Sequence, residues 1–188
     1  MIDPAWVACQ VPGVWRRRLT THADERGSFT ELWRSSWLNG PAGRDDAIQA
    51  AQANVSRSDA GVLRGLHFHQ HQADFWVALE GRAFVGLVDL RPMLDGGERP
   101  SVETLELETG DALYIPEGVA HGFFAHEPLT LVYLVTNEYD GTDEHGFAWN
   151  DELANVPWPV VSPTLSGRDA SNPPLREVIS KMRLRAPN

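Results

Sequence analysis

The chain has 188 residues, of which 42% are hydrophobic and 22% charged, and it carries a formal net charge of −10. This length and composition suit one globular domain with a full core, and they exclude a disordered or collagen-like chain. The acidic charge argues against binding of nucleic acid or of membrane surfaces through general phosphate attraction. Any anionic ligand would need a local group of arginines.

The chain shows no sign of a membrane or secreted protein. No apolar run approaches the roughly 18–20 residues of a membrane helix, and residues 1–18 lack the pattern of a secretory signal peptide. Cys9 is the only cysteine, which excludes an intrachain disulfide framework and a cysteine-based zinc site. These observations favour a cytoplasmic protein.

Strand-like segments dominate the chain, rich in β-branched and aromatic residues and separated by turn signals. In chain order they cover residues 75–81, 82–91, 101–109, 111–117 and 129–139. Many short strands at this spacing predict an all-β sandwich or barrel. The alternation in 101–109 predicts one buried and one exposed face. The nearly continuous apolar run of 129–136 predicts a strand that is buried on both faces or lies at a subunit contact.

Two short segments favour helices. They are residues 45–52, DDAIQAAQ, and residues 176–184, REVISKMRL, in a tail richer in proline and charge. No repeat, linker or low-complexity segment divides the chain. Residues 1–188 are therefore expected to form one domain, with the N-terminal strands and the C-terminal tail packed on the central strands or on a partner subunit.

Histidines provide the first chemical signal. His67, His69 and His71 alternate in one stretch, and alternate residues of a strand point to the same face. The sequence therefore predicts that they line one wall. A second stretch ends in a tight turn that presents His121. Together the two stretches favour a polar site built from separate strands over a set of unrelated surface histidines.

The spacing of these stretches resembles the cupin superfamily. Residues 110–121 follow Gly–x5–Pro–x–Gly–x2–His, which is similar to the second cupin motif. Residues 67–81 follow His–x–His–x4–Asp–x6–Gly, which is similar to the first motif with aspartate in place of the usual glutamate. The resemblance implies the cupin jelly roll, a small double-stranded β-helix barrel, with a few short peripheral helices.

A narrower resemblance covers almost the whole chain. It is carried, in order, by residues 24–27 (DERG), 52–58 (QANVSRS), 62–67 (VLRGLH), 115–123 (IPEGVAHGF), Tyr133, 149–151 (WND) and 165–169 (LSGRD). In this order and spacing they resemble the dTDP-4-dehydrorhamnose 3,5-epimerase family. The resemblance implies a homodimeric isomerase of deoxysugar biosynthesis. Its substrate is a 4-keto-6-deoxy nucleotide sugar, inverted at C3, C5 or both without a redox cofactor.

That chemistry needs a base, an acid on the opposite face of the sugar, and a positive or hydrogen-bonding group near the O4 oxyanion. The resemblance places the base at His67, its carboxylate partner at Asp169 and the acid at Tyr133. Imidazole suits proton abstraction near neutrality, and a phenol with a pKa of about 10 stays protonated. The apolar pattern around Tyr133 alone favours a core residue, and only the family register gives it a catalytic role.

Further positions match residues that hold the nucleotide. Arg64 matches the arginine that meets the diphosphate, and a planar guanidinium suits phosphate oxygens. The pattern alone fits a surface salt bridge at Arg64 equally well. Arg26 and Glu31 match a segment that, in the family, crosses to the neighbouring subunit and helps to hold the nucleotide.

The remaining predicted substrate contacts are polar or aromatic. Gln52 and Asn54 match polar pocket residues, and His121 matches a pocket histidine. Tyr139 and Trp149 are candidates for the walls of the nucleotide and sugar sites. Trp149 suits a packed core position equally well.

Two positions near the first histidine stretch depart from the family pattern, and Leu134, after the tyrosine, often corresponds to a lysine in relatives. Relatives usually carry a lysine at the register of Asp74, facing the O4 side of the sugar, and they usually lack a histidine at the position of His69. A carboxylate at Asp74 would oppose an enolate rather than stabilise it. Whether the chain carries out the usual 3,5-epimerisation is therefore left open. Asp74 is still predicted to lie in the substrate site.

An alternative interpretation links these departures. His67, His69, Asp74 and His121 form the three-histidine, one-carboxylate set by which many cupins hold a divalent metal. A metal would neutralise Asp74 and polarise a ketone, but it would compete for His67 as base. The leading hypothesis is an epimerase without a cofactor. The alternatives are a metal-binding cupin with diverged or lost activity, and a catalytically silent sugar-nucleotide binder.

Overall fold

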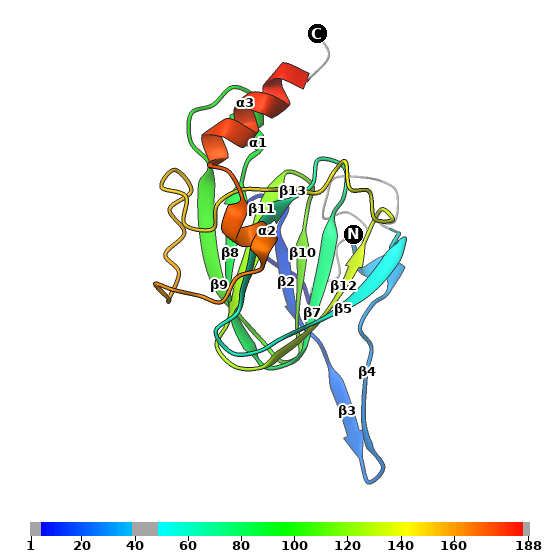
Figure 1. Ribbon diagram of the computed structural model, residues 1–188. Coiled ribbons are helices and arrows are strands. Elements are labelled where there is room, and N and C mark those ends of the chain that lie inside the picture. The colour runs from blue at the N-terminus through cyan, green and yellow to red at the C-terminus, as the bar shows by residue number, and fades with distance from the viewer. Residues whose placement is uncertain (1–4, 39–48, 186–188) are drawn as a thin grey trace.

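The computed structural model describes residues 5–38 and 49–185, and two antiparallel β-sheets face each other in it (Figure 1). The larger sheet has six strands in the spatial order β1 (Val7–Ala8), β2 (Trp15–Arg18), β10 (Asp111–Ile115), β7 (Asp74–Glu80), β12 (Leu129–Val135) and β5 (Gln52–Ser58). The smaller sheet has five, in the order β13 (His145–Gly146), β6 (Leu63–Phe68), β11 (Val119–Ala125), β8 (Arg82–Asp89) and β9 (Ser101–Glu108). This is the all-β jelly roll that the sequence predicts.

A separate hairpin of β3 (Thr21–Asp24) and β4 (Gly27–Thr30) projects away from the two sheets (Figure 1). A short 3-10 helix, η1 (Ser35–Leu38), follows it. Nearly every residue of the hairpin is exposed. The hairpin is therefore held by its own strand pairing rather than by burial against the rest of the chain.

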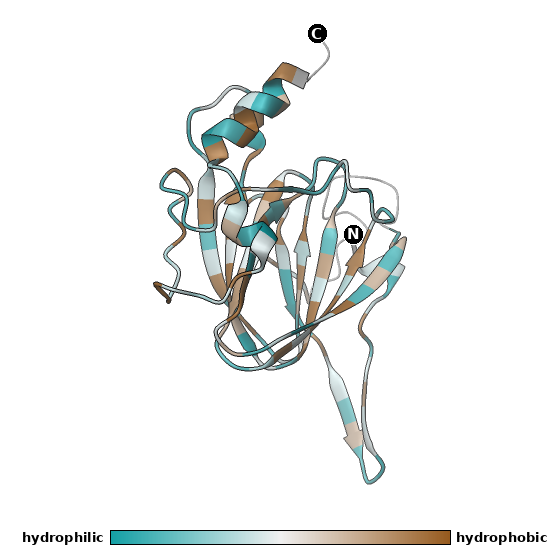
Figure 2. Cartoon of the chain, in the orientation of Figure 1, coloured by the Kyte–Doolittle hydropathy of each residue, from teal (hydrophilic) through white to brown (hydrophobic). Residues whose placement is uncertain are grey.

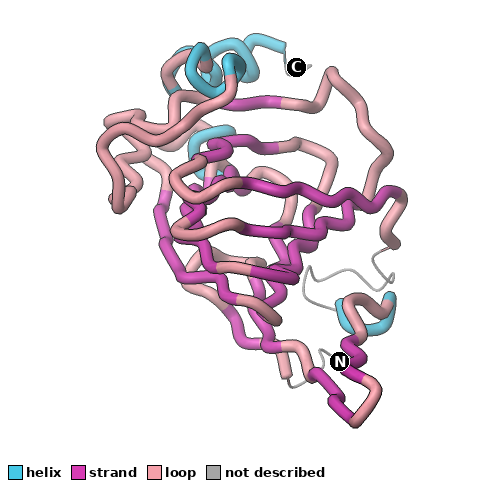
Figure 3. The backbone as a smooth tube through the Cα atoms, turned by 60° about the horizontal axis from the view of Figure 1, so that its bottom comes forward, coloured by secondary structure: helices cyan, strands magenta, loops and turns pink. Residues whose placement is uncertain are grey.

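The helices are short and peripheral (Figure 3). They are α1 (Arg91–Leu94), α2 (Gly167–Ser171) and α3 (Leu175–Arg185). The helix predicted at 176–184 is confirmed as α3. Within the described ranges, no helix combines the length and the hydropathy needed to cross a membrane.

The helix predicted at 45–52 is wrong for residues 49–52. Residues 45–48 lie outside the described residues, residues 49–51 form no helix, and Gln52 begins β5. Gln52 pairs with Val135 on β12. Sheet pairing therefore takes precedence over the local helical pattern.

The predicted strands are all present, but some end earlier than expected. The segment predicted at 82–91 stops at Asp89, because Pro92 lies in the first turn of α1. A proline lacks the N–H that a strand ladder needs and suits the start of a helix. The segment predicted at 129–139 stops at Val135, after which the chain leaves the sheet.

The core fills the space between the sheets, and the hydrophobic residues alternate along the strands (Figure 2). On β12, Leu129 and Leu131 are buried, whereas Val132 and Leu134 on the other face are only half-buried. The prediction that this strand is buried on both faces is therefore wrong for the chain by itself. The alternative of a subunit contact stays a prediction.

Two glycines let β6 and β11 approach each other at the centre of the smaller sheet. A Cβ atom on Gly122 would lie 2.7 Å from a backbone oxygen of β6, and one on Gly65 would lie 2.8 Å from a backbone oxygen of β11. Gly65 also has a φ of +120°, which favours glycine. This close ladder places His67 opposite His121, so that both imidazoles belong to one site.

Candidate active site

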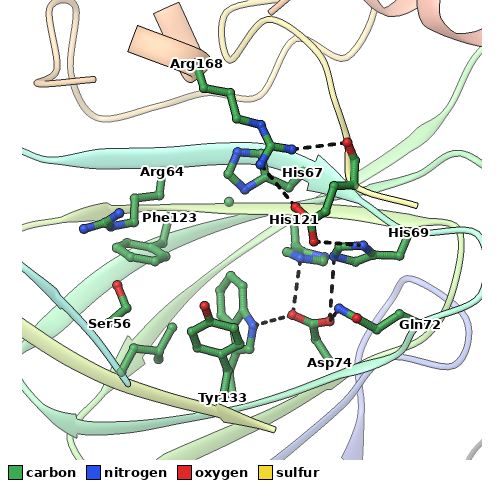
Figure 4. A pocket seen from close by; sticks show the side chains of 14 residues that line it. Ser56, Arg64, His67, His69, Gln72, Asp74, His121, Phe123, Tyr133 and Arg168 are labelled. Atoms are coloured by element: carbon green, nitrogen blue, oxygen red, sulfur yellow. Dashed lines mark hydrogen bonds and ion pairs between the residues drawn. The ribbon is translucent and has the colours of Figure 1, made fainter. Parts of the chain in front are cut away.

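A cavity of about 220 Å³ lies between the sheets and draws residues from both (Figure 4). Of the site residues predicted from the sequence, six line it: Arg64, His67, His69, Asp74, His121 and Tyr133. The first two are on β6, His69 directly follows that strand, and the last three are on β7, β11 and β12. Side chains that are far apart in the sequence are therefore gathered into one polar pocket.

His67 forms a close pair with Asp169. The Nε2 atom of the imidazole lies 2.6 Å from Oδ1 of the carboxylate, which is buried. Asp169 lies in the first turn of α2, where its backbone N–H donates to the N-cap hydroxyl of Ser166 at 3.0 Å. The helix cap thus fixes the carboxylate against the histidine.

Burial would raise the pKa of Asp169, but hydrogen bonds and the neighbouring imidazole outweigh it and lower that pKa below its ordinary value. The donors are His67, Ser166 and the backbone N–H of Gly65. An ionised carboxylate only accepts hydrogen bonds, so Nε2 of His67 carries the proton that it donates. In the neutral ring, Nδ1 then holds a lone pair that can take up a proton.

Tyr133 enters the cavity from the opposite sheet. It lies on β12, between Trp76 on β7 and Asn54 on β5, and Figure 4 shows its phenol across the cavity from His67. Burial, with the charges of Asp74 and Glu144, raises the pKa of Tyr133 above its ordinary value, against a smaller lowering effect of Arg64. The phenol is therefore protonated at neutral pH and able to donate.

Asp74 is buried, with 4% of its surface exposed, and its carboxylate is held by two donors. The side-chain amide of Gln72 donates to Oδ1 at 2.9 Å, and the indole N–H of Trp76 donates to Oδ2 at 3.2 Å. The Nε2 atom of His121 lies 3.6 Å from Oδ2, and Nε2 of His69 lies 3.9 Å from Oδ1. Asp74 is thus the centre of a buried cluster with two imidazoles.

Both imidazoles are fixed by backbone carbonyl oxygens. Nδ1 of His69 donates to the carbonyl of Asp143 at 2.9 Å, and Nδ1 of His121 donates to that of Val119 at 3.1 Å. Burial, together with the neighbouring histidines, lowers the pKa of His121 to about 4, although the charge of Asp74 acts in the opposite direction. His121 is therefore neutral at pH 7.

Two arginines lie at the rim of the cavity. Arg64 is exposed and donates from Nε to the hydroxyl of Ser58 at 2.9 Å. Arg168 forms an ion pair with Glu144 at 3.1 Å on another part of the rim. Both guanidinium groups are placed where a phosphate group at the mouth would meet positive charge.

Four predicted contacts lie outside the cavity lining. Gln52 donates to Asn54 at 2.8 Å, and the side-chain oxygen of Gln52 accepts the backbone N–H of Tyr139 at 2.9 Å. The Tyr139 side chain is 70% exposed. Trp149 is half-buried, and its carbonyl accepts the indole N–H of Trp158 at 2.7 Å. The structure thus joins Gln52, Asn54 and the backbone of Tyr139 into one polar group at the start of β5, on the same face of the strand as Ser56 of the cavity lining.

Arg26 and Glu31 also lie outside the cavity. Arg26, at the tip of the projecting hairpin, pairs with Asp24, and Glu31 pairs with Arg34. Neither of them is among the residues that line the cavity. Their predicted role in a neighbouring subunit stays a prediction.

The prediction that three alternating histidines line one wall is wrong for His71. The strand β6 ends at Phe68, after which the chain bends, so the two-residue period does not continue. His67 and His69 still line the cavity, whereas His71 is exposed.

Sequence reasoning did not predict eight residues of the cavity lining. They are Ser56, Gln72, Trp76, Gly122, Phe123, Leu131, Glu144 and Arg168. The period of two along strands gives a signal for some of them: Ser56 shares a face with Asn54, and Trp76 shares one with Asp74. Glu144 comes from a loop and has no such signal.

In this jelly roll, the cavity holds a histidine of one sheet, backed by a buried carboxylate of α2, and a protonated phenol of the other sheet. These features define a cupin-fold site suited to acid–base chemistry. The chain matches the family model for dTDP-4-dehydrorhamnose 3,5-epimerase over residues 8–177. The enzyme of that name from Mycobacterium tuberculosis (strain ATCC 25618 / H37Rv) is 37% identical over 175 residues, which are 89% of this chain and 86% of the relative.

Solved structures agree. A 4-keto-6-deoxy sugar epimerase from the novobiocin gene cluster of Streptomyces spheroides matches with a TM-score of 0.82 at 32% identity, over 95% of this chain and 90% of that one. An epimerase from Legionella pneumophila, in complex with dTDP-4-keto-L-rhamnose, matches with a TM-score of 0.81 at 26% identity. The match covers 94% of this chain and 95% of that one. The chain belongs to the dTDP-4-dehydrorhamnose 3,5-epimerase family, and it is an isomerase.

Proposed function

We propose that the chain epimerises a 4-keto-6-deoxy nucleotide sugar of the dTDP type, with His67 as base and Tyr133 as acid. The observation that carries these roles is the 2.6 Å contact between His67 and Asp169 in a cavity whose other wall holds Tyr133. A base and an acid on opposite walls are what inversion of a carbon centre needs.

The reaction follows from the acidity of a C–H bond next to a ketone. Nδ1 of His67 takes the proton, and the electron pair of the C–H bond moves toward the ketone oxygen to give an enolate. Asp169 stabilises the imidazolium that forms. The hydroxyl of Tyr133 then gives a proton to the opposite face of the same carbon. The phenolate regains a proton from solvent, and the imidazolium of His67 releases the proton that it took, so both groups return to their starting state. The sugar is neither oxidised nor reduced, so no redox cofactor takes part.

The nucleotide would lie toward the rim. Arg64 is our candidate for the diphosphate, because its exposed guanidinium lies beside the cavity. We also propose a homodimer in which the projecting hairpin carries Arg26 and Glu31 to the partner's cavity. Phe29 on this hairpin is 63% exposed, and a large apolar side chain at the surface is expected where a partner subunit covers it. A cytoplasmic location stays a prediction from the single cysteine.

The test is isotope exchange. The chain is incubated with dTDP-4-keto-6-deoxyglucose in D2O, and proton NMR follows the signals of C3 and C5. The parent should lose the proton at each carbon that it inverts and form the inverted product. His67→Ala should show no exchange, whereas the exposed His71→Ala should behave as the parent. Unchanged exchange in His67→Ala would eliminate His67 as the base, and absence of exchange in the parent would overturn the proposed activity.

A further inference from the structure

Three buried side chains at one end of the cavity converge on a common point (Figure 4). The ligand atoms of His69, Asp74 and His121 all lie within 4.8 Å of one another, and each residue is at most 6% exposed. We propose that these three residues bind a divalent transition-metal ion, with two imidazole Nε2 atoms and one carboxylate as its protein ligands.

The orientation of the two imidazoles carries the proposal. Each ring donates its Nδ1 proton to a backbone carbonyl, so the neutral ring presents the lone pair of Nε2 to the carboxylate of Asp74. Within residues 5–38 and 49–185, neither Nε2 atom takes part in a hydrogen bond. Two lone pairs and a carboxylate that face one another repel, and a cation between them turns this repulsion into attraction. This is also how metal-binding histidines are held, with the second nitrogen donating to a carbonyl.

The distances suit one ion. Zinc binds imidazole nitrogen and carboxylate oxygen at about 2.0–2.2 Å, so two ligands of one ion are at most about 4.2 Å apart. Nε2 of His121 lies 3.6 Å from Oδ2 of Asp74 and Nε2 of His69 lies 3.9 Å from Oδ1, so each imidazole is within this limit of one carboxylate oxygen. The three ligand atoms together lie within 4.8 Å of one another, and shifts of a few tenths of an ångström bring all of them onto one ion. Gln72 and Trp76 each donate to a different oxygen of Asp74 and so fix the carboxylate for a metal, as partners of ligating carboxylates do.

The proposed set omits His67, which the four-ligand alternative from the sequence includes. The Nε2 atom of His67 is held on Asp169 at 2.6 Å. A metal on the other three residues therefore leaves His67 available as a base. Metal binding and proton abstraction no longer compete for the same side chain.

Two imidazoles and one carboxylate leave coordination positions open, and this donor set suits Zn²⁺ or Fe²⁺. The cluster lines the same cavity as His67 and Tyr133, so an open position would face a bound substrate. We infer that the ion supplies the positive charge for the ketone oxygen that the carboxylate of Asp74 alone cannot supply. This last step rests on the proposed function, whereas the metal site itself does not.

Metal binding is tested without substrate. The full chain, freed of any affinity tag and of bound metal by a chelator, is titrated with Zn²⁺ and analysed by mass spectrometry of the metal after gel filtration. Titration with Co²⁺ is followed by its visible absorption, which reports imidazole and carboxylate ligation. We expect about one ion per chain, and an affinity that falls by at least roughly 100-fold in His69→Gln and Asp74→Asn.

The matched control is His71→Gln, which removes an exposed histidine two positions from His69 and should bind metal as the parent does. Failure of the parent to retain Zn²⁺ and to change the Co²⁺ spectrum would overturn the site. Equal loss in His71→Gln would also overturn it, because binding would then be a surface property. A chain that binds metal but shows no isotope exchange would keep the site and refute the proposed activity.

Discussion

Nε2 of His67 and Oδ1 of Asp169 are 2.6 Å apart, although 102 residues separate them in the sequence. The histidine is carried by β6 in the smaller sheet, and the aspartate by α2, which packs on that strand. A buried carboxylate in this position selects one tautomer of the ring and stabilises the imidazolium formed when the ring takes up a proton. The packing of α2 therefore fixes the orientation and the tautomer of an imidazole on another element.

Asp169→Asn separates these two effects. The amide oxygen of asparagine still accepts the Nε2 proton, so the tautomer is kept, but the negative charge is lost. We expect the rate of α-proton exchange in D2O to fall by roughly 10- to 100-fold, as when carboxylates that orient histidines are replaced, with little change in KM. Parent-like kcat in this variant would contradict the role of Asp169.

Tyr133→Phe removes the proposed acid and keeps the ring. Exchange of the substrate proton should survive, because His67 and Asp169 are intact. Net inversion should fall by roughly 100-fold or more, the usual contribution of a positioned acid. Proton NMR measures both rates in one sample. Equal loss of exchange and inversion would show that Tyr133 does not act after the enolate forms.

The raised pKa of Tyr133 predicts the alkaline limb of the pH profile. Burial is the main cause, with the charges of Asp74 and Glu144 adding to it. The phenol is active when protonated, so a raised pKa keeps the inversion rate constant beyond a pH of about 10, the ordinary value for tyrosine. The rate should fall only above this, and circular dichroism checks that the fold persists. A decline below about pH 9 would contradict the assignment.

The strands can be predicted from local signals in the sequence, whereas the pairing of the catalytic residues cannot. Strand positions follow from local signals, because alternation and turn residues are read within a few positions. The pairing of His67 with Asp169 is long-range, and only the family resemblance predicts it. The helix predicted at 45–52 fails at Gln52 because pairing with Val135 depends on a distant strand.

The cavity residues show the same limit. His71 is misplaced because the two-residue period assumes a strand that continues past Phe68, whereas the chain bends there. Glu144 and Arg168 meet at the rim from a loop and from α2, and no periodicity connects them. The cupin resemblance predicts a set of metal ligands that includes His67. Only the side-chain geometry shows that Nε2 of His67 is turned to Asp169 instead.

Substitutions of Asp74 test whether positive charge at this end of the cavity is what the reaction needs. Asp74→Asn should lose the metal ion and most of the inversion activity. Asp74→Lys should also lose the ion, because an ammonium group repels it, but the ammonium then lies near the ketone oxygen. Two unit charges about 4 Å apart attract by about 4 kcal/mol at an effective dielectric constant of 20, so the effect is large enough to measure.

We therefore expect Asp74→Lys to be at least roughly 10-fold faster than Asp74→Asn, and to keep its rate when a chelator is added, whereas the parent should lose activity. Metal content and circular dichroism of all three chains provide the controls, since a buried ammonium beside His69 and His121 can unfold the site. If both variants fold and are equally inactive, charge is not what Asp74 provides. Asp74→Lys could also react faster than a parent that contains no metal. The ion would then have no part in the reaction, and Asp74 would be a poor substitute for the lysine of the relatives.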